Sequence, residues 1–334
     1  MKKFLKILLR IVTVLAILVG VFILFIELCY DKKFKDTPYP TGIKASTDST
    51  IIARGKYLVY GPAHCASCHT DKGQEAMVDQ GQEVPLAGGF EIHLPLCVLR
   101  PRNITPDKET GIGNLTDAEI ARTLRYNVNS KGEALIPVMP FKDMSDEDMI
   151  AVISYLRAQN PVKHLVKPTE YNLLGKAIKY FLIKPDGAKD TPPHMVTRDS
   201  SAIYGKYLAT SVSNCYGCHT ERDLKTGAFI GQPFAGGFIF EPSEETQGWE
   251  FVSPNLTPDN ETGKITSWDQ TAFCRRIKNG RVFKYSPMPW GPFSRMDETD
   301  MKAIHNFLIT IKAVTNKIEK TAYQPGEDMP RPKS

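Results

Sequence analysis

The pattern Cys-x-x-Cys-His occurs twice in this 334-residue chain, at residues 65–69 and again at residues 215–219. Two cysteines three positions apart lie on the same face of a helical turn, so both sulfur atoms can bond to one planar group. The pattern is typical of covalent attachment of a c-type haem, with the histidine as an iron ligand. We therefore expect two covalently bound haem c groups. The residues that hold them are the tethering cysteines Cys65, Cys68, Cys215 and Cys218 and the metal ligands His69 and His219.

A zinc site is the alternative interpretation of each pattern. Structural zinc normally takes four ligands, often from two Cys-x-x-Cys pairs that lie close together. Here the two pairs are 150 residues apart and belong to different copies of a repeat. This separation favours haem attachment over zinc binding.

The repeat extends well beyond the haem patterns. Arg-Gly-Lys-Tyr-Leu at 54–58 corresponds to Tyr-Gly-Lys-Tyr-Leu at 204–208, and Asn-Ile-Thr-Pro-Asp at 103–107 corresponds to Asn-Leu-Thr-Pro-Asp at 255–259. A period of about 150 residues is that of a duplicated domain and not of a solenoid unit. The chain therefore contains two copies of one haem domain.

Amphipathic spacing predicts three matched pairs of helices in the two copies. These pairs are expected at 49–60 and 200–210, after Thr116 and Thr266, and at 145–156 and 297–308. Thr116 followed by Glu119 is a capping-box signature. Acidic residues crowd the first turns of the last pair, as the helix dipole favours.

Residues 11–26 are almost wholly apolar, and with the leucines and isoleucine before them they are long enough to span a bilayer as a helix. The basic residues that precede this segment are Lys2, Lys3, Lys6 and Arg10. Basic flanks stay on the cytoplasmic side, so the haem domains are expected in the periplasm of a bacterium, on its inner membrane. A cleaved signal peptide is the alternative, but residues 26–29 form a poor cleavage site.

The charge balance is close to neutral, with 42 Lys and Arg against 37 Asp and Glu. A net charge of +5 gives no reason to expect a nucleic-acid partner. Three cysteines remain after haem attachment, and Cys29 is expected to be inert. Cys97 and Cys274 fall in different copies, and an oxidising compartment would permit a disulfide between them without requiring it.

Methionine is the first candidate for the second axial ligand of each iron, because the two repeats supply matched methionines. Met/His ligation would raise the reduction potential and leave no open site for oxygen or peroxide. Met139 follows His69 by 70 residues, and Met288 follows His219 by 69 residues. Each lies in a proline-containing Met-Pro loop just before the last helix of its copy, which suits a fixed ligand. Met144 and Met296 are the alternative pair.

Several glycines, arginines and histidines each have two alternative roles. Gly-Gly pairs at 88–89 and 236–237 are expected to let the backbone approach a surface such as the haem edge, or to form turns. Four arginines are expected either to pair with haem propionates, as arginine pairs with carboxylates, or to be solvated at the surface. They are Arg100, Arg102, Arg275 and Arg276. Histidines without a partner in the other copy are expected to be surface or structural residues, namely His64, His93, His164, His194 and His305.

The segment between the copies contains a basic amphipathic helix. Its apolar residues share one face, while Lys176, Lys179 and Lys184 lie off that face. Such a helix either packs across the two haem domains or lies at the membrane surface or against a partner subunit. The sequence leaves these alternatives open.

The Asn-[Ile/Leu]-Thr-Pro-Asp strings with Glu-Thr-Gly after them, together with the Met-Pro loops, resemble the c-type cytochrome subunits of membrane-bound bacterial alcohol, gluconate, sorbitol and fructose dehydrogenases. The resemblance covers about residues 50–160 and 200–312. It implies helical cytochrome c domains repeated in tandem, exposed to the periplasm and bound to the inner membrane. Together with the repeat and the apolar segment, this predicts an all-α fold of two tandem cytochrome c-like haem domains after an N-terminal transmembrane helix. Those subunits usually carry three haem domains and a C-terminal membrane segment, so this chain differs in both respects.

The resemblance implies a function in the respiratory chain: single-electron transfer in the periplasm between a donor, such as a dehydrogenase subunit, and an acceptor. An electron-transfer protein is favoured over a catalyst. A di-haem enzyme, either a peroxidase or a thiosulfate-oxidising cytochrome, is the alternative. The predicted organisation is an anchor at 1–30, a linker at 31–48, haem domains at 49–160 and 200–315, an inter-domain linker at 161–199 and a tail at 316–334. Sequence does not name the donor, the acceptor, the order of the haem potentials or the oligomeric state.

Overall fold

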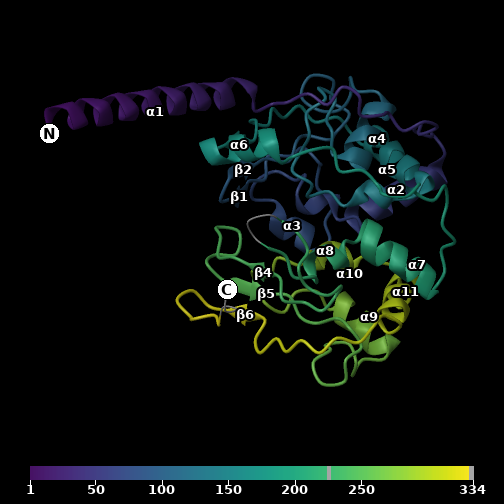
Figure 1. Ribbon diagram of the computed structural model, residues 1–334. Helices are drawn as coiled ribbons and strands as arrows, with labels where there is room; N and C mark the ends of the chain where they lie inside the picture. Colours follow the sequence, from purple (N-terminus) through teal and green to yellow (C-terminus); the bar gives the residue numbers. More distant parts are fainter. Residues whose placement is uncertain (224–226, 331–334) are drawn as a thin grey trace.

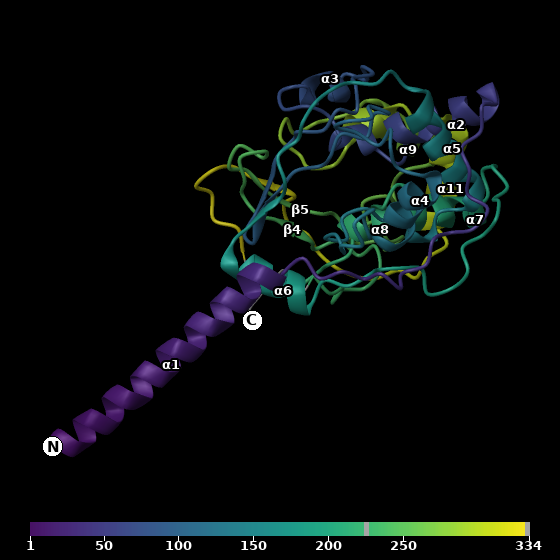
Figure 2. The same cartoon turned by 90° about the horizontal axis from the view of Figure 1, so that it is seen from above.

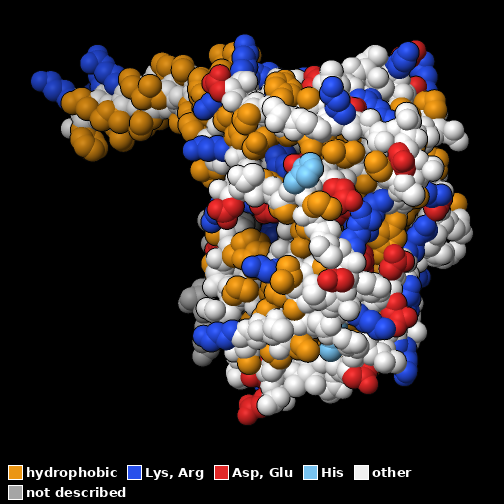
Figure 3. Space-filling view, turned by 90° about the vertical axis from the view of Figure 1, so that its right-hand side faces the viewer, with side chains coloured by type: hydrophobic (Ala, Val, Ile, Leu, Met, Phe, Trp, Pro, Cys, Tyr) orange, Lys and Arg blue, Asp and Glu red, His pale blue; other side chains and the backbone are white. Residues whose placement is uncertain are grey.

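Helix α1 (Lys2–Cys29) projects from the rest of the molecule in the computed structural model, which describes residues 1–223 and 227–330 (Figure 1). Its 28 residues extend about 40 Å at 1.5 Å per residue, more than the apolar thickness of a bilayer. Among the described residues it is the one helix long and apolar enough to cross a membrane. Basic side chains gather at its free end and apolar ones cover its length (Figure 3).

The first repeat (residues 49–160) is built from short helices and one hairpin. Its elements are α2 (Ser49–Tyr60), the 3₁₀ helix η1 (Cys65–Ser67), α3 (Glu75–Asp79), β1 (Ile92–Leu94), β2 (Cys97–Leu99), α4 (Asp117–Tyr126), the 3₁₀ helix η2 (Phe141–Asp143) and α5 (Asp146–Ala158). Strand β3 (Glu170–Tyr171) and helix α6 (Leu173–Phe181) follow it.

The second repeat (residues 200–315) has a matching order. Its elements are α7 (Ala202–Tyr207), the π-helical turn η3 (Leu208–Val212), α8 (Cys215–Cys218), β4 (Ile239–Phe240), β5 (Glu250–Val252), α9 (Gln270–Lys278), α10 (Trp290–Ser294) and α11 (Glu298–Leu308). Strand β6 (Ala322–Tyr323) lies in the predicted tail, whose last four residues fall outside the described part of the chain.

The first and last helices of each repeat pack together at a glycine. A Cβ atom on Gly55 of α2 would lie 1.8 Å from the Ala151 carbonyl oxygen of α5. A Cβ on Gly205 of α7 would lie 1.8 Å from the Ala303 carbonyl oxygen of α11. The first and last predicted helices of each repeat are confirmed, as is the helix after Thr116 with its capping box, in which Thr116 and Glu119 each bond the other's backbone. The helix expected from Thr266 begins later, at Gln270, because Asp269 is its N-cap and accepts from the N–H of Ala272. Only glycine allows these two helix pairs to approach so closely.

The expected all-α class is not confirmed, because the described residues also contain two small antiparallel sheets. In the first, β2 pairs with β1 and with β3, and in the second β5 pairs with β4 and with β6. The third strand of each sheet comes from the segment after the last helix of its repeat. Strands of two or three residues leave little periodicity in a sequence, and their pairing depends on a distant segment.

The Asn-x-Thr-Pro-Asp strings form the same hydrogen bonds in both repeats. The Asn103 side chain accepts from the Thr105 backbone at 2.9 Å and donates to the Val162 carbonyl at 2.8 Å. Asn255 repeats this with Thr257 at 2.9 Å and Val314 at 2.8 Å. The string thus joins its own loop to the segment that follows the last helix. The two repeats therefore share these hydrogen bonds as well as the sequence.

The two repeats exchange equivalent tyrosines across their interface. Tyr57 of the first repeat donates to Asp300 at 2.7 Å and accepts from the backbone N–H of Asp297 at 2.9 Å. Tyr207, which occupies the same place in the second repeat, donates to Asp148 at 2.9 Å and accepts from the N–H of Ser145 at 3.1 Å. Reciprocal contacts of this kind define a two-fold-like arrangement of the repeats.

At the centre of this interface the repeats differ in charge. Arg54 donates to Asp148 at 2.9 Å and to the hydroxyl of Tyr204, its own counterpart, at 3.2 Å. Because Tyr204 stands where the first repeat has an arginine, Asp300 lacks the equivalent of the Arg54 ion pair, and its burial raises the pKa of that carboxyl. The hydroxyl of Tyr57 is therefore important for keeping Asp300 hydrogen-bonded.

We expect Tyr57→Phe to lower the free energy of unfolding by about 1–3 kcal/mol, because it removes one of the two tyrosine hydroxyls that bond the buried Asp300 and leaves the Asp297 N–H without its partner. Urea titration followed by circular dichroism measures this. Tyr39→Phe is the control, because Tyr39 is exposed. An equal effect of the two substitutions would contradict the importance of the exchanged tyrosines.

Candidate haem sites

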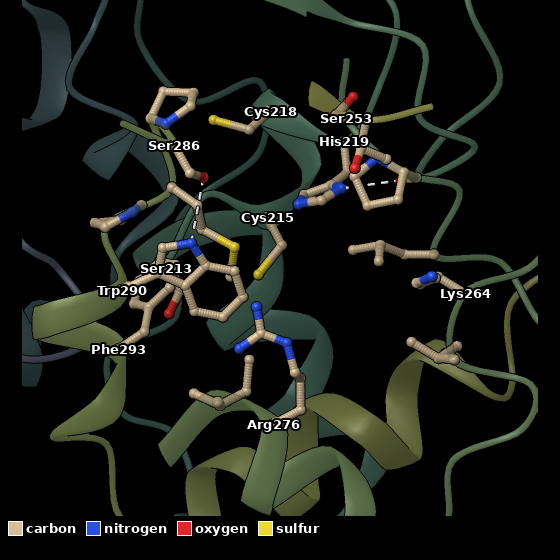
Figure 4. Close-up of a pocket in the computed structure, with 18 of the residues that line it drawn as sticks. Ser213, Cys215, Cys218, His219, Ser253, Lys264, Arg276, Ser286, Trp290 and Phe293 are labelled. Atoms are coloured by element: carbon tan, nitrogen blue, oxygen red, sulfur yellow. Dashed lines mark hydrogen bonds between the residues drawn. The ribbon is translucent and has the colours of Figure 1, made fainter. Parts of the chain in front are cut away.

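The second repeat encloses an apolar cavity of about 450 Å³ around its Cys-x-x-Cys-His turn (Figure 4). Cys215, Cys218 and His219 enter it from α8 and the residue after it. Its wall is mainly aliphatic and aromatic, with Phe273 from α9 and Leu308 from α11 among the lining residues. A concave, mostly apolar cavity with a few convergent polar groups fits a large flat cofactor such as haem.

Each motif histidine is held by a backbone carbonyl. Nδ1 of His219 lies 3.1 Å from the carbonyl oxygen of Pro254, and Nδ1 of His69 lies 2.7 Å from that of Arg102. Since a carbonyl only accepts, Nδ1 carries the hydrogen, and the lone pair on Nε2 is left for a metal. Burial also lowers the pKa of both imidazoles, which favours their neutral, metal-binding form.

The first cysteine of each motif is shielded from solvent, and burial raises the pKa of Cys65 to about 12 and that of Cys215 to about 12. Within residues 1–223 and 227–330 no cluster of three or more His, Cys, Asp or Glu side chains is placed to hold an ion, as a structural zinc site would require. The residues at both turns fit thioether attachment of haem.

A glycine after each motif brings the accepting carbonyl into place. Gly236 (φ +74°) has no room for a Cβ, which would lie 2.5 Å from the Pro254 carbonyl carbon. A Cβ on Gly88 (φ +71°) would likewise lie 2.5 Å from the carbonyl carbon of Arg102. A close neighbour of these glycines is therefore the loop that carries the histidine's acceptor. The expected approach to the haem edge stays a prediction. The N–H of each glycine also donates to the carbonyl of the motif histidine, at 2.8 Å for Gly236 and 2.9 Å for Gly88.

The structure brings Met288 into the same cavity as His219 and the two cysteines. Met296 of the alternative pair also lines this cavity but is almost fully buried. In the first repeat, Met139 is partly buried against the core in the loop before η2, whereas Met144 is fully buried. The assignment of the second axial ligands remains a prediction.

Of the four arginines with possible roles at haem propionates, Arg276 lines the second-repeat cavity (Figure 4). Its guanidinium lies 3.9 Å from the ring centroid of Trp290, which fixes its orientation. Arg100 instead pairs with Glu91, and Arg102 donates to the Val166 carbonyl at 3.0 Å. Arg275 is exposed.

His64 is the residue whose position the sequence did not predict. It directly precedes Cys65 in the first repeat, yet its side chain lines the cavity of the second repeat and meets the ring of Phe293 edge-on at 5.4 Å. Its backbone is left-handed (φ 41°), as is that of Asn214 (φ 54°), which occupies the same place in the second repeat. The alignment of the repeats pairs His64 with Asn214, but the direction of the His64 side chain depends on how the two repeats pack together.

The remaining cysteines are unpaired thiols. Cys97 is buried in β2 and Cys274 is buried in α9, and Cys29 lies at the end of α1. In the described chain none of the three forms a disulfide.

Comparison with known proteins agrees with this geometry. Residues 52–160 match the cytochrome c family model, and that class of domain carries covalently bound haem c. The chain is 29% identical over 70% of its length to the gluconate 2-dehydrogenase cytochrome c subunit of Pantoea cypripedii. It is 27% identical over 80% of its length to the cytochrome c subunit of the quinone-dependent alcohol dehydrogenase of Gluconobacter oxydans.

A third relative is a nicotinate dehydrogenase subunit of Pseudomonas putida, 28% identical over 82% of this chain. The chain spans 22% of that relative, and 52% and 56% of the gluconate and alcohol dehydrogenase subunits. The predicted resemblance to the cytochrome c subunits of dehydrogenases is confirmed.

We expect Gly236→Ala to lower the free energy of unfolding by about 1–2 kcal/mol for the left-handed backbone and by about 1–3 kcal/mol more for the overlap with Pro254. It should also perturb the absorption and redox potential of the second haem, because the His219 hydrogen bond is displaced. Gly280→Ala is the matched control, since Gly280 has φ +69° but nothing within 4 Å of its Cβ position. Equal losses for the two variants would mean that the glycine has no role in positioning the carbonyl.

Proposed function

We propose that this chain is a membrane-anchored di-haem cytochrome c that transfers single electrons in the periplasm between a dehydrogenase subunit and an acceptor of the respiratory chain. The observation that carries the proposal is the matched pair of Cys-x-x-Cys-His turns, in which both histidines present a free Nε2 because Nδ1 donates to a loop carbonyl. Bound haem supplies a one-electron Fe(III)/Fe(II) couple.

The chain's own residues account for the rest of this chemistry. Cys65 with Cys68, and Cys215 with Cys218, are proposed to tether the two macrocycles. His69 and His219 are proposed as the first axial ligands. Met139 and Met288 are proposed to close the other side of each iron, which raises the reduction potential and excludes oxygen and peroxide.

The anchor and the relatives support the location and the partner. The basic residues at the free end of α1 favour a cytoplasmic N-terminus, which leaves both repeats in the periplasm. Several relatives are cytochrome subunits of dehydrogenases, which supports a dehydrogenase as donor. Genomic neighbours of this chain would identify it.

The packing of the repeats supports electron transfer between the two haems within one chain. The exchanged tyrosines hold the repeats in one arrangement. His64 joins the Cys-x-x-Cys-His turn of the first repeat to the cavity wall of the second. This position supports a path for electrons through its imidazole. A packed side chain at this point couples the two sites better than a gap or solvent would.

We expect Met288→Leu to abolish the weak far-red absorption of one ferric Met-ligated haem and to lower the potential of that haem, while the haem count per chain stays at two. Visible spectroscopy, redox titration and the pyridine haemochrome assay measure these three quantities. Met296→Leu is the matched control and should retain the far-red band. If the unmutated protein lacks the band and turns over peroxide, the di-haem enzyme is the correct interpretation instead.

We expect His64→Asn to slow electron transfer between the haems after rapid photoreduction, because it removes the ring from the cavity wall. Asparagine tolerates the left-handed backbone and already stands at the equivalent Asn214, so the fold should be retained. Both midpoint potentials should change little, which separates a slower path from a change in driving force. His194→Asn is the control, because that side chain is 84% exposed. An unchanged transfer rate in His64→Asn would remove this residue from the path.

A further inference from the structure

Helix α6 exposes its apolar face and turns its lysines toward the protein, whereas a surface helix of a soluble domain does the opposite. Its outward face carries four large apolar side chains, and the exposed fractions are 42% for Leu173, 62% for Leu174, 49% for Phe181 and 67% for Leu182. Its lysines face the protein, with 21% of the Lys176 side chain and 10% of the Lys179 side chain exposed. A helix that buries charge and exposes leucine requires an apolar partner on its outward face.

The lysine face of α6 is bound to the end of the membrane anchor. Lys176 pairs with Glu27 and Lys179 pairs with Asp31, and both ammonium groups lie 5.3 Å from the ring centroid of Tyr30. These contacts determine which face of α6 is inward. The apolar face therefore cannot turn toward the core without breaking both ion pairs.

The N-terminal end of α6 contacts the first repeat. A Cβ on Gly175 would lie 2.1 Å from the Leu96 carbonyl oxygen, so helix and hairpin are in direct backbone contact. Asn172 strengthens this contact by donating its backbone N–H to Leu96 at 3.1 Å and its side chain to Pro95 at 2.9 Å. Helix α6 is thus a rigid bridge between α1 and the first repeat.

The depth of α6 follows from its ring contacts with α1. Tyr180 meets Phe25 edge-on at 5.2 Å, and Phe181 stacks on Phe22 with ring centroids 6.5 Å apart. Phe22 lies two turns before the end of α1, which corresponds to about 10 Å along the helix axis. Figures 1 and 2 both show α6 beside the C-terminal end of α1. If α1 spans a bilayer, the outward face of α6 lies at the depth at which interfacial amphipathic helices bury their apolar side chains.

We propose that α6 is a second membrane contact, whose Leu173, Leu174, Phe181 and Leu182 enter the outer leaflet at the boundary of headgroups and acyl chains. This inference rests on the membrane anchoring of α1 in the proposed function. Its consequence is that the first repeat is held at a fixed angle to the membrane, because α6 is joined both to the anchor and to the β1–β2 hairpin. The segment at 31–48 then does not act as a free tether.

The test uses the full-length di-haem protein in phospholipid nanodiscs, with one cysteine at a time labelled with a nitrobenzoxadiazole fluorophore in a Cys29→Ser background. The labelled variants are Leu174→Cys on the outward face of α6, Leu15→Cys in the middle of α1 and Ile203→Cys on α7, where the side chain is 85% exposed. Lipids with a nitroxide near the headgroup or deep in the acyl chain quench labels at those depths. The ratio of emission with and without nitroxide cancels constant quenching by haem.

We expect headgroup-proximal nitroxide to quench the label at position 174 several-fold more than the label at 203, and deep nitroxide to quench the label at 15 most. If position 15 is quenched while position 174 behaves like 203, α6 is not at the membrane and this inference is overturned, although the anchor stands. If position 15 is not quenched, the anchor itself is wrong and the inference falls with it. A label at 174 that is shielded from both nitroxides by a second copy, seen as a dimer by light scattering, also overturns the inference.

Discussion

The hydrogen bond from Nδ1 of each motif histidine to a loop carbonyl is the interaction on which the two sites depend. It selects the tautomer, leaves the lone pair of Nε2 free and holds the imidazole ring in one plane. The bond exists only because the loop at 101–102 or 253–254 packs directly on a glycine backbone, at Gly88 or Gly236. The same loop continues into the Asn-x-Thr-Pro-Asp string, whose asparagine ties it to the chain leaving the last helix. In each repeat, the glycine contact, the loop and the asparagine hydrogen bond therefore connect the last helix to the orientation of one imidazole.

The interface between the two repeats is built from equivalent residues of each repeat. Tyr57 and Tyr207 belong to the first helices of their repeats, yet each bonds the start of the last helix of the other. The replacement of Arg54 by Tyr204 at the equivalent position removes one positive charge from the centre of this interface. Two arginines there would face each other across the two-fold-like axis, so a single arginine is the arrangement that avoids repulsion between like charges. The duplicated halves are thus no longer interchangeable, and neither are the electrostatic environments of the two sites.

Much of this architecture could be predicted from the sequence, and the exceptions share a cause. The helix pairs, the capping box at Thr116, and the entry of Met288 into the cavity of His219 follow from local pattern and from the alignment of the repeats. The sheets could not be predicted in this way, because β3 and β6 have two residues each and are defined only by distant partners. The position of His64 depends on the packing of one repeat against the other. The role of Gly88 as a contact for the loop at 101–102 likewise requires knowledge of which backbone segment approaches it.

The two sheets also explain how the anchor and the sites are related in space. Figure 1 shows β1, β2 and the strands of the second sheet on the side of the globular part from which α1 projects, with the long helices of both repeats on the far side. This follows from the two-fold-like arrangement, which turns equivalent edges of the repeats the same way. Phe240 and Phe251, from β4 and β5, are part of the cavity wall of the second repeat. Since α6 connects the first sheet to α1, an orientation of α6 at the membrane determines the orientation of the second cavity as well. If α6 lies at the membrane as proposed, one short helix and one buried interface relate the anchor to both Cys-x-x-Cys-His turns.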